Sequence, residues 1–213
     1  ILATIRDISD TCIGSVKING NPVGTTEAQD IQEWDKLETG GCSMSSLYFV
    51  DHSIVRLAAN TTITLRSAWT PSWSGATDVT LNQGELWARV LKPITDDSYF
   101  NISSEEGSVG VRGTSVHIKR NNNSTPYNAL DDTLDAIPMD SGTLTDPNSS
   151  SGVIALLATG AIQKQLVPLK KKVKMKKTTV KVQDYKDKKK DFKTQKDNWL
   201  DSLLYTESMI ELD

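Results

Sequence analysis

The sequence has few of the residues that build covalent or metal frameworks. Its 213 residues include only two cysteines and two histidines. That number is too small for a dense disulfide scaffold, and it excludes most structural zinc sites, which take four Cys or His ligands. The sequence therefore predicts neither a metal centre nor any other cofactor.

Long hydrophobic runs are also missing. The longest purely apolar stretch is Val153–Ala158, whereas a helix needs about 20 apolar residues to cross a bilayer. No membrane span is expected. The composition, 37% hydrophobic and 24% charged, is nevertheless ordinary enough to build a packed core, which excludes wholesale disorder.

Catalytic signatures are absent as well. His52 is expected in a hairpin turn and His117 on a strand, and neither belongs to a triad motif. Gly107–Gly113 is rich in glycine but runs between expected strands, so it is not a phosphate-binding loop. The three aspartates within 131–135 are candidate calcium ligands outside a cell, but they lack the glycine of an EF-hand loop. The sequence predicts a protein that is not an enzyme.

Arginine is absent from the C-terminal segment, which is strongly basic through lysine. Residues 1–163 hold 10 Lys and Arg against 19 Asp and Glu, and residues 164–213 hold 14 against 8. Nucleic-acid binding usually adds arginine forks and stacking aromatics, so nucleic acid is not an expected partner. A basic tail beside an acidic body instead predicts docking on an acidic protein surface, of the same molecule or of a neighbour. The lysines expected to make this contact are Lys170, Lys171, Lys172, Lys174, Lys176 and Lys177.

What the sequence does contain is a series of short strand patterns. They recur roughly every 8–12 residues between Gly, Asn and Asp residues, and no long amphipathic helix interrupts them. Such spacing is typical of an antiparallel, mainly β domain, either a sandwich or a roll. Trp87 alternates with polar residues and is expected in the core. The clearest patterns lie at residues 3–8, 14–18, 46–50, 54–57, 61–65, 79–81, 85–90, 99–102, 109–111 and 115–119.

The C-terminal half changes in character. Residues 120–152 begin and end with loop composition and predict a peripheral insertion, and strand character resumes at 153–162. Valine and methionine alternate with lysine and threonine within 173–182, which predicts a strand or hairpin. A short amphipathic helix is expected over 198–212, with Leu200, Leu203 and Leu204 at helical spacing and Met209 one turn further on. Trp199 and the three leucines are expected to take part in the docking contact of the tail. The expected domains are a β domain at 1–163 and a basic appendage at 164–213.

Several features favour an oxidising, extracellular setting. Cys12 and Cys42 are separated by 29 residues. Their pairing would close a loop worth about 3–4 kcal/mol, and two buried free thiols are the alternative. The chain begins at Ile1 without Met, which also favours secretion. N-glycosylation triplets begin at Asn60, Asn101, Asn122, Asn123 and Asn148.

Two further tryptophans, Trp69 and Trp73, lie in a loop with Pro, Ser and Gly. They are expected either to clasp the edge of the sheet or to form a surface that binds glycans or proteins.

The order of motifs between residues 37 and 118 resembles the FecR-type domain. The matching motifs are Leu37–Gly41, Leu47–Val50, the hairpin Asp51–Leu57, Leu81–Trp87, Tyr99–Ile102 and Val111–Val116. With Ala3–Ile18 and the segment Ala155–Ile162, the resemblance covers roughly 1–163. It implies an extracytoplasmic β-roll or sandwich without catalysis, which in the best-known members relays a signal from an outer-membrane receptor to a membrane-spanning anti-sigma segment.

The leading hypothesis from the sequence is a secreted or cell-surface structural module. In it, the basic tail of one copy docks on the acidic body of the next, which would build a homo-oligomer or filament, with another surface protein as a further partner. The Lys-rich tail stands where the family's receptor-contacting module would follow, which favours this structural reading. A periplasmic FecR-like regulator and a glycan-binding module are the alternatives.

Overall fold

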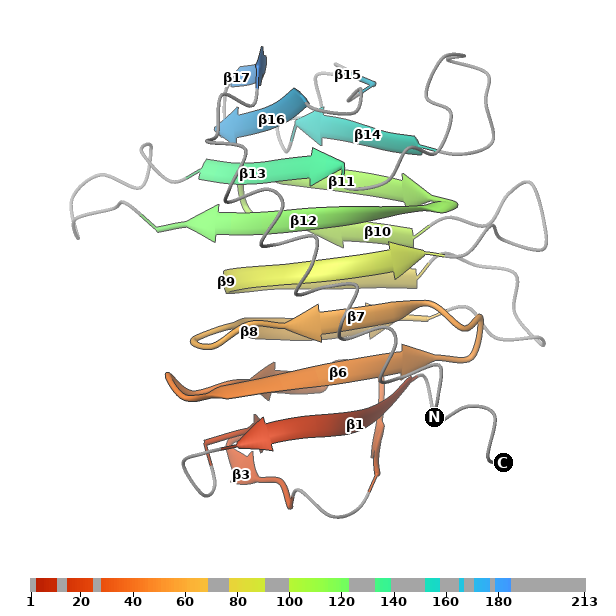
Figure 1. Ribbon diagram of the computed structural model, residues 1–213, viewed down its shortest axis with the longest axis vertical. Helices are drawn as coiled ribbons and strands as arrows, with labels where there is room; N and C mark the ends of the chain where they lie inside the picture. Colours follow the sequence, from red (N-terminus) through yellow and green to blue (C-terminus); the bar gives the residue numbers. More distant parts are fainter. Residues whose placement is uncertain are drawn as a thin grey trace. The chain divides into compact units, whose positions relative to one another are not determined.

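The computed structural model describes residues 3–10, 15–24, 28–68, 77–90, 100–122, 133–138, 152–157, 165–166, 171–176 and 179–184. Every regular element within these ranges is a β-strand (Figure 1). The chain divides into two compact units, Ile1–Gln183 and Asp184–Asp213. The described strands belong to the first unit, apart from Asp184 at the end of the last strand.

The strands of this unit form two layers, which we call sheet A and sheet B. Neighbours in sheet A are all antiparallel, in the order β4–β1–β6–β7–β9–β12–β13–β16. Figure 1 shows sheet A as the nearer layer, from β1 in red to β16 in blue. The bounds are β4 Gln29–Ile31, β1 Ala3–Asp10, β6 Ser43–Phe49, β7 Ile54–Leu57, β9 Thr77–Val90, β12 Thr114–Asn121, β13 Thr133–Pro138 and β16 Lys171–Lys176.

Sheet B runs in the order β3–β2–β5–β8–β9–β10–β11–β14–β15. Its pairs are antiparallel except β9 with β10, which is parallel. The bounds are β3 Asn21–Pro22, β2 Lys17–Ile18, β5 Lys36–Glu38, β8 Thr62–Ser67, β10 Phe100–Ser103, β11 Gly107–Arg112, β14 Gly152–Leu157 and β15 Gln165–Leu166, and a further strand, β17, spans Thr179–Asp184.

Strand β9 belongs to both sheets. Its first half pairs with β8 and β10 in sheet B, and its second half pairs with β7 and β12 in sheet A. The change falls at Gly84, whose φ is +93°. A Cβ there would lie 2.5 Å from Thr61 Oγ1 and 2.6 Å from Thr61 Cα, so only glycine fits. The Thr61 hydroxyl donates to the Glu85 carbonyl (2.9 Å) and accepts from the Glu85 N–H (3.1 Å), which fixes the bend.

This bend differs from the expectation that residues 79–81 and 85–90 form two separate strands. Residues 82–84 between them have turn chemistry, but the chain does not reverse, because each half of β9 finds partners in a different sheet.

The core lies between the two sheets. Alternate residues of each strand are buried, among them Leu57, Leu86 and Ile118 from sheet A and Ile63, Leu81 and Ile102 from sheet B. Phe49 of β6 meets Phe100 of β10 edge to face, with ring centroids 5.2 Å apart, so an aromatic pair joins the layers. Trp87, expected in the core, alternates with buried Leu86 and Ala88 and therefore lies on the outer face of sheet A.

The mainly antiparallel β architecture predicted from the sequence is confirmed. Residues 120–152, expected as a peripheral insertion, contribute β13, which lies between β12 and β16 inside sheet A. The Lys-rich segment forms β16 and β17, and the compact unit extends past residue 163 to include them up to Gln183. The division at 163/164 stays a prediction, and the helix expected at 198–212 lies outside the described residues.

Candidate functional site

Residues of opposite charge lie side by side across the outer face of sheet A. Lys119 of β12 is opposite Glu85 of β9 and Asp135 of β13, and Asp135 is opposite Lys174 of β16. We call these four residues the charge ladder. Their neighbours along the strands, such as Leu86 and Ile118, face the core. Facing opposite charges stabilise a sheet modestly, by about 0.2–1 kcal/mol per pair.

Glu85 is the best connected residue of the charge ladder. His117 Nε2 lies 2.7 Å from Glu85 Oε1, and Lys119 Nζ lies 3.4 Å from Glu85 Oε2. Burial alone would raise the pKa of the Glu85 carboxyl, but the hydrogen bond and charge of His117, together with Lys119, outweigh burial and hold the pKa below its ordinary value. The His117 ring also stacks on Trp87, with centroids 5.2 Å apart.

Two polar atoms beside this cluster are buried and unpaired. Within the described part of the chain, His117 Nδ1 and Trp87 Nε1 have no hydrogen-bond partner. A buried polar atom without a partner costs about 1–3 kcal/mol. The His117 ring is therefore hydrogen-bonded at one nitrogen only, through Nε2 to Glu85.

A second, deeper ion pair joins the two sheets. Arg120 of β12 donates from Nε and Nη2 to the two carboxylate oxygens of Glu106, each at 2.9 Å, and Glu106 is fully buried. Arg120 also donates from Nη1 to the Asn82 carbonyl, and Glu105 lies 3.3 Å away. Glu106 accepts a further bond from Ser104 Oγ at 2.8 Å. This bidentate geometry satisfies both charges, so Arg120 is committed to the fold rather than to a ligand.

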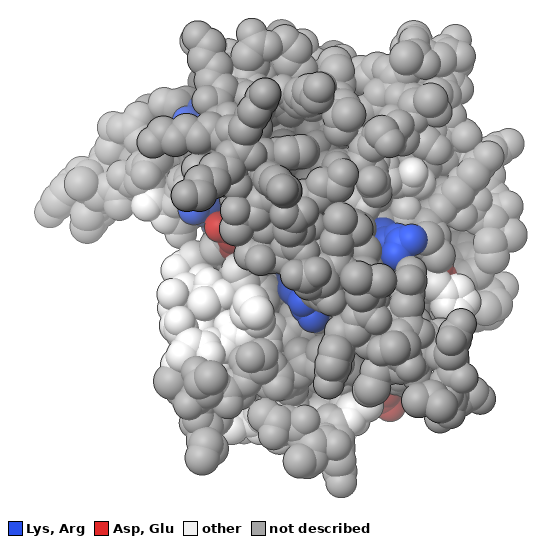
Figure 2. Space-filling view, viewed as in Figure 1, with Lys and Arg blue, Asp and Glu red and all other residues white. Residues whose placement is uncertain are grey.

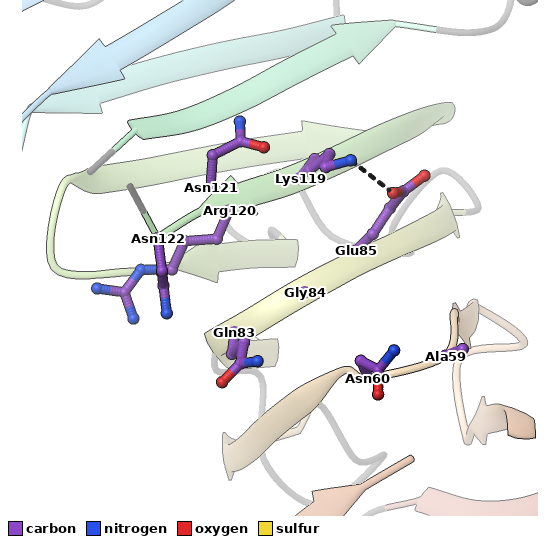
Figure 3. Close-up of a pocket in the computed structure, with 9 residues that line it drawn as sticks. All are labelled: Ala59, Asn60, Gln83, Gly84, Glu85, Lys119, Arg120, Asn121 and Asn122. Carbon is purple, nitrogen blue, oxygen red and sulfur yellow. Dashed lines mark ion pairs between the residues drawn. The ribbon is translucent and has the colours of Figure 1, made fainter. Parts of the chain in front are cut away.

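A polar cavity of about 350 Å³ lies where β9 bends (Figure 3). The turn before β8, the middle of β9 and the end of β12 supply its walls. The charged walls are already paired within the protein, which leaves the amide side chains to offer donors and acceptors. The lining residues are Ala59, Asn60, Gln83, Gly84, Glu85, Lys119, Arg120, Asn121 and Asn122.

The side chains that line the cavity are mostly amide and charged groups. No Ser, Thr, Cys or His lines the cavity, and its Lys119 and Glu85 side chains form an ion pair with each other. The described residues also contain no group of three or more His, Cys, Asp or Glu side chains placed to hold a metal ion. Nor does the described part of the chain include a helix long and apolar enough to cross a membrane.

On the face seen in Figure 2, the described Lys and Arg side chains lie in separate places, and acidic atoms adjoin one of them. Lys119 and Arg120 each form an ion pair within the protein, with Glu85 and Glu106 respectively.

Some of the residues singled out in the sequence fall in this region, and others cannot be placed. Asn60 and Asn122 line the cavity, Asn101 lies on β10, and Lys171, Lys172, Lys174 and Lys176 lie on β16. Cys42 is disulfide-bonded. Cys12, Trp69, Trp73, Asn123, Asn148, Lys170, Lys177, Trp199, Leu200, Leu203 and Leu204 lie outside the described residues. The roles predicted for all these residues stay predictions.

One exposed side chain, that of Trp34, was not singled out in the sequence as a candidate site residue. Trp34, in the turn between β4 and β5, is 59% exposed and has a φ of +70°. The Arg66 guanidinium lies 5.0 Å from the centre of its ring. The signal in the sequence was a tryptophan directly before Asp35 in a short polar segment, where a turn rather than a core strand was the better expectation.

Part of the sequence matches a known protein family. Residues 35–133, which run from the turn before β5 to the start of β13, match the model of the FecR protein family. The chain contains a FecR-type domain. The resemblance seen in the sequence is thus confirmed. No curated protein sequence matches the chain.

Two crystal structures share the fold of the FecR-type domain. Both are of a "putative anti-sigma factor" from Parabacteroides distasonis ATCC 8503, at 1.65 and 2.50 Å resolution. Each has a TM-score of 0.50 and 12% sequence identity, over 70% of this chain. At that identity the likeness concerns the fold alone, and this chain spans only 59% of the length of the other protein.

These comparisons correct the leading hypothesis from the sequence. The prediction of a structural subunit that assembles with itself into a filament or homo-oligomer is wrong. The FecR match and the anti-sigma structures point to a signal-transducing regulator, which was the alternative. The charge asymmetry that suggested self-assembly has another explanation in part, because β13 and β16 place Asp135 opposite Lys174 within one molecule.

Proposed function

We propose that this chain is part of a signal-transducing regulator of the FecR type, which acts in the periplasm through contacts with other proteins and not by catalysis. The match of residues 35–133 to the FecR family carries the proposal, because that range includes β9 and the strands that pair with it in both sheets. The likeness in fold to an anti-sigma factor supports it.

The chemistry of the described residues agrees with a binding role. Arg120 and Glu106 satisfy each other in the interior, and Glu85 is held by His117 and Lys119. In these ion pairs each charged side chain is bound to another side chain of the protein, so none of them is an activated nucleophile. The glycan-binding alternative rests on Trp69 and Trp73, and no described residue favours it.

The periplasmic location is supported by Cys42, which is disulfide-bonded. Disulfides persist in oxidising compartments and are rare where thiols are kept reduced. Trapping thiols in intact cells with an alkylating agent, followed by non-reducing electrophoresis, tests this point. We expect the oxidised form in cells, and a fully reduced Cys42 would contradict a periplasmic location.

The regulatory role is tested by removing the gene and measuring all transcripts. We expect a small, coherent set of genes to change, and we expect the wild-type gene to restore it. The Gly20→Ala variant serves as a matched control for Gly84→Ala, because both replace a glycine of positive φ and only the second disturbs β9. Gly20→Ala should restore regulation and Gly84→Ala should not. Unchanged transcription in the deletion strain would refute the proposal.

A further inference from the structure

The turn that carries Trp34 is an exposed connection between the two sheets. This turn links β4 of sheet A to β5 of sheet B and consists of residues 32–35. Trp34 is 59% exposed, the highest value among the large hydrophobic side chains of the described residues that are exposed. A tryptophan carries more apolar surface than any other side chain, so its exposure at this level calls for a reason.

The backbone at Trp34 is strained, and the turn is held firmly in place. A φ of +70° is unfavourable for a bulky residue, and such conformations concentrate at functional positions. The Trp34 N–H donates to the Leu65 carbonyl (2.6 Å), and the Leu65 N–H donates to the Asp35 carbonyl (3.0 Å). The Asp35 carboxylate accepts from Asn19 Nδ2 (2.6 Å) and from the Gln32 N–H (2.7 Å).

These bonds show what the fold requires at this turn and what it does not. Backbone groups and the Asp35 carboxylate hold the conformation, whereas the Trp34 residue is 59% exposed. A glycine at position 34 would satisfy the same backbone with less strain. The backbone of this turn therefore does not require a tryptophan at position 34.

Arg66 completes the surface. It projects from β8, is exposed, and places its guanidinium 5.0 Å from the centre of the Trp34 ring. Tryptophan and arginine are the side chains most enriched at the energetic centres of protein interfaces. A guanidinium stacked on an indole presents apolar area and positive charge together, already oriented, so little conformational entropy is lost on binding.

We propose that Trp34 and Arg66 form the centre of a docking surface for a folded protein partner. The indole enters an apolar socket of that partner, and the Arg66 guanidinium faces a carboxylate at the rim of the socket. This inference rests on the proposed function, since it names the surface through which a regulator of this type meets a protein. A protein is favoured over a sugar because ligand sites for small molecules are concave, whereas Trp34 stands on an exposed turn beside exposed Gln32 and Glu33.

The first experiment places a photo-crosslinking amino acid at position 34 of the full chain, in the cells that naturally make it. The same replacement at Val50 is the matched control, because Val50 is also an exposed hydrophobic residue in a turn (44% exposed). We expect one discrete protein adduct from position 34 and none of that mass from position 50. The adduct is then identified by mass spectrometry and the partner is purified.

The second experiment titrates the purified partner with the wild-type chain and its variants. Trp34→Gly should weaken binding at least about 30-fold, which is the threshold for a hot spot, and Arg66→Ala should weaken it less. Trp34→Phe should restore part of the affinity, and Val50→Ala should bind as the wild type does. Because glycine relieves the strain, the melting temperature of Trp34→Gly should not fall below that of the wild type, which separates a binding role from a structural one.

Several results would overturn the inference. Equal affinity of Trp34→Gly and the wild type for the partner would do so while leaving the regulatory function intact. No protein adduct from position 34, or an adduct formed only from position 50, would do the same. Binding of oligosaccharides made from the cell wall, lost in Trp34→Gly and without any protein adduct, would assign the surface to a sugar instead. Failure of the regulatory function itself is read separately, from transcription in the deletion strain.

Discussion

Gly84 permits a direct test of how one strand serves two sheets. Replacing it with alanine imposes two penalties. The first is the left-handed backbone at a φ of +93°, which costs an alanine about 1–2 kcal/mol. The second is overlap of the new Cβ with Thr61 Oγ1 at 2.5 Å, Thr61 Cα at 2.6 Å and the Asn60 carbonyl at 2.7 Å, which adds about 1–3 kcal/mol of overpacking.

Gly20 isolates the first penalty. Its φ is +81°, but a Cβ there would meet no atom within 4 Å, so Gly20→Ala carries only the backbone cost. Alanine also restricts the unfolded chain and recovers part of that cost. We expect Gly20→Ala to lower the free energy of unfolding by about 1 kcal/mol and Gly84→Ala by about 3 kcal/mol. At this size of protein, these values correspond to melting temperatures lowered by about 3 °C and 9 °C.

Thermal unfolding of the full chain, followed by circular dichroism at one pH, measures both shifts. Adding Thr61→Ala to Gly84→Ala should not restore stability, because two of the three overlapping atoms are backbone atoms and remain. Equal losses for Gly20→Ala and Gly84→Ala would refute the reasoning, since they would mean that β9 bends without close contact to the turn at residues 60–61.

Three further predictions concern the ion pairs and the core. Arg120→Met should cost about 3–5 kcal/mol because it leaves the buried Glu106 carboxylate unpaired, and the double variant with Glu106→Gln should recover most of the loss in a denaturant-based double-mutant cycle. The Glu85 carboxyl has a lowered pKa in the fold, so its stabilising effect is present above its ordinary value of 4.5 and is lost as the pH falls through the lowered pKa. In an acid titration of the free energy of unfolding, Glu85→Gln should therefore lose stability less steeply than the wild type below pH 4.5. An equally steep loss in both proteins would contradict the lowered pKa of Glu85. Ile118→Ala should cost about 2–5 kcal/mol in urea unfolding, whereas loss of the exposed ion pair in Lys119→Ala should cost less than about 1 kcal/mol.

The sequence allowed most strands to be predicted, because their patterns have a period of two. The run at 85–90 places Leu86, Ala88 and Val90 on one face, and these three are buried as the alternation requires. Alternation alone does not show which set of alternate residues faces the core and which set faces outward. Trp87 was assigned to the core on its hydrophobicity, but its neighbours occupy the core positions, so it pairs with His117 on the outer face.

Long-range pairing could not be predicted from local patterns. Asn82–Gly84 has the chemistry of a turn, and only the partners on both sides, β8 and β7, make it a bend within one strand. The residues of the candidate site depend on the same pairing. Glu85 and His117 are 32 positions apart and meet only because β9 and β12 are neighbours. The buried bond between Arg120 and Glu106 depends likewise on a contact that crosses from one sheet to the other.

The shared strand has a consequence for how a message can travel through this protein. A sandwich whose layers have separate strands can open or slide between them, and each layer can melt by itself. Here one continuous strand joins the layers, since residues 78–83 of β9 pair with β8 and residues 84–90 pair with β12. Hydrogen exchange along β9 should therefore proceed only through global unfolding. If a partner docks at the β4–β5 turn as proposed, we expect its effect to be transmitted by movement of the unit as a whole, because its two sheets share β9.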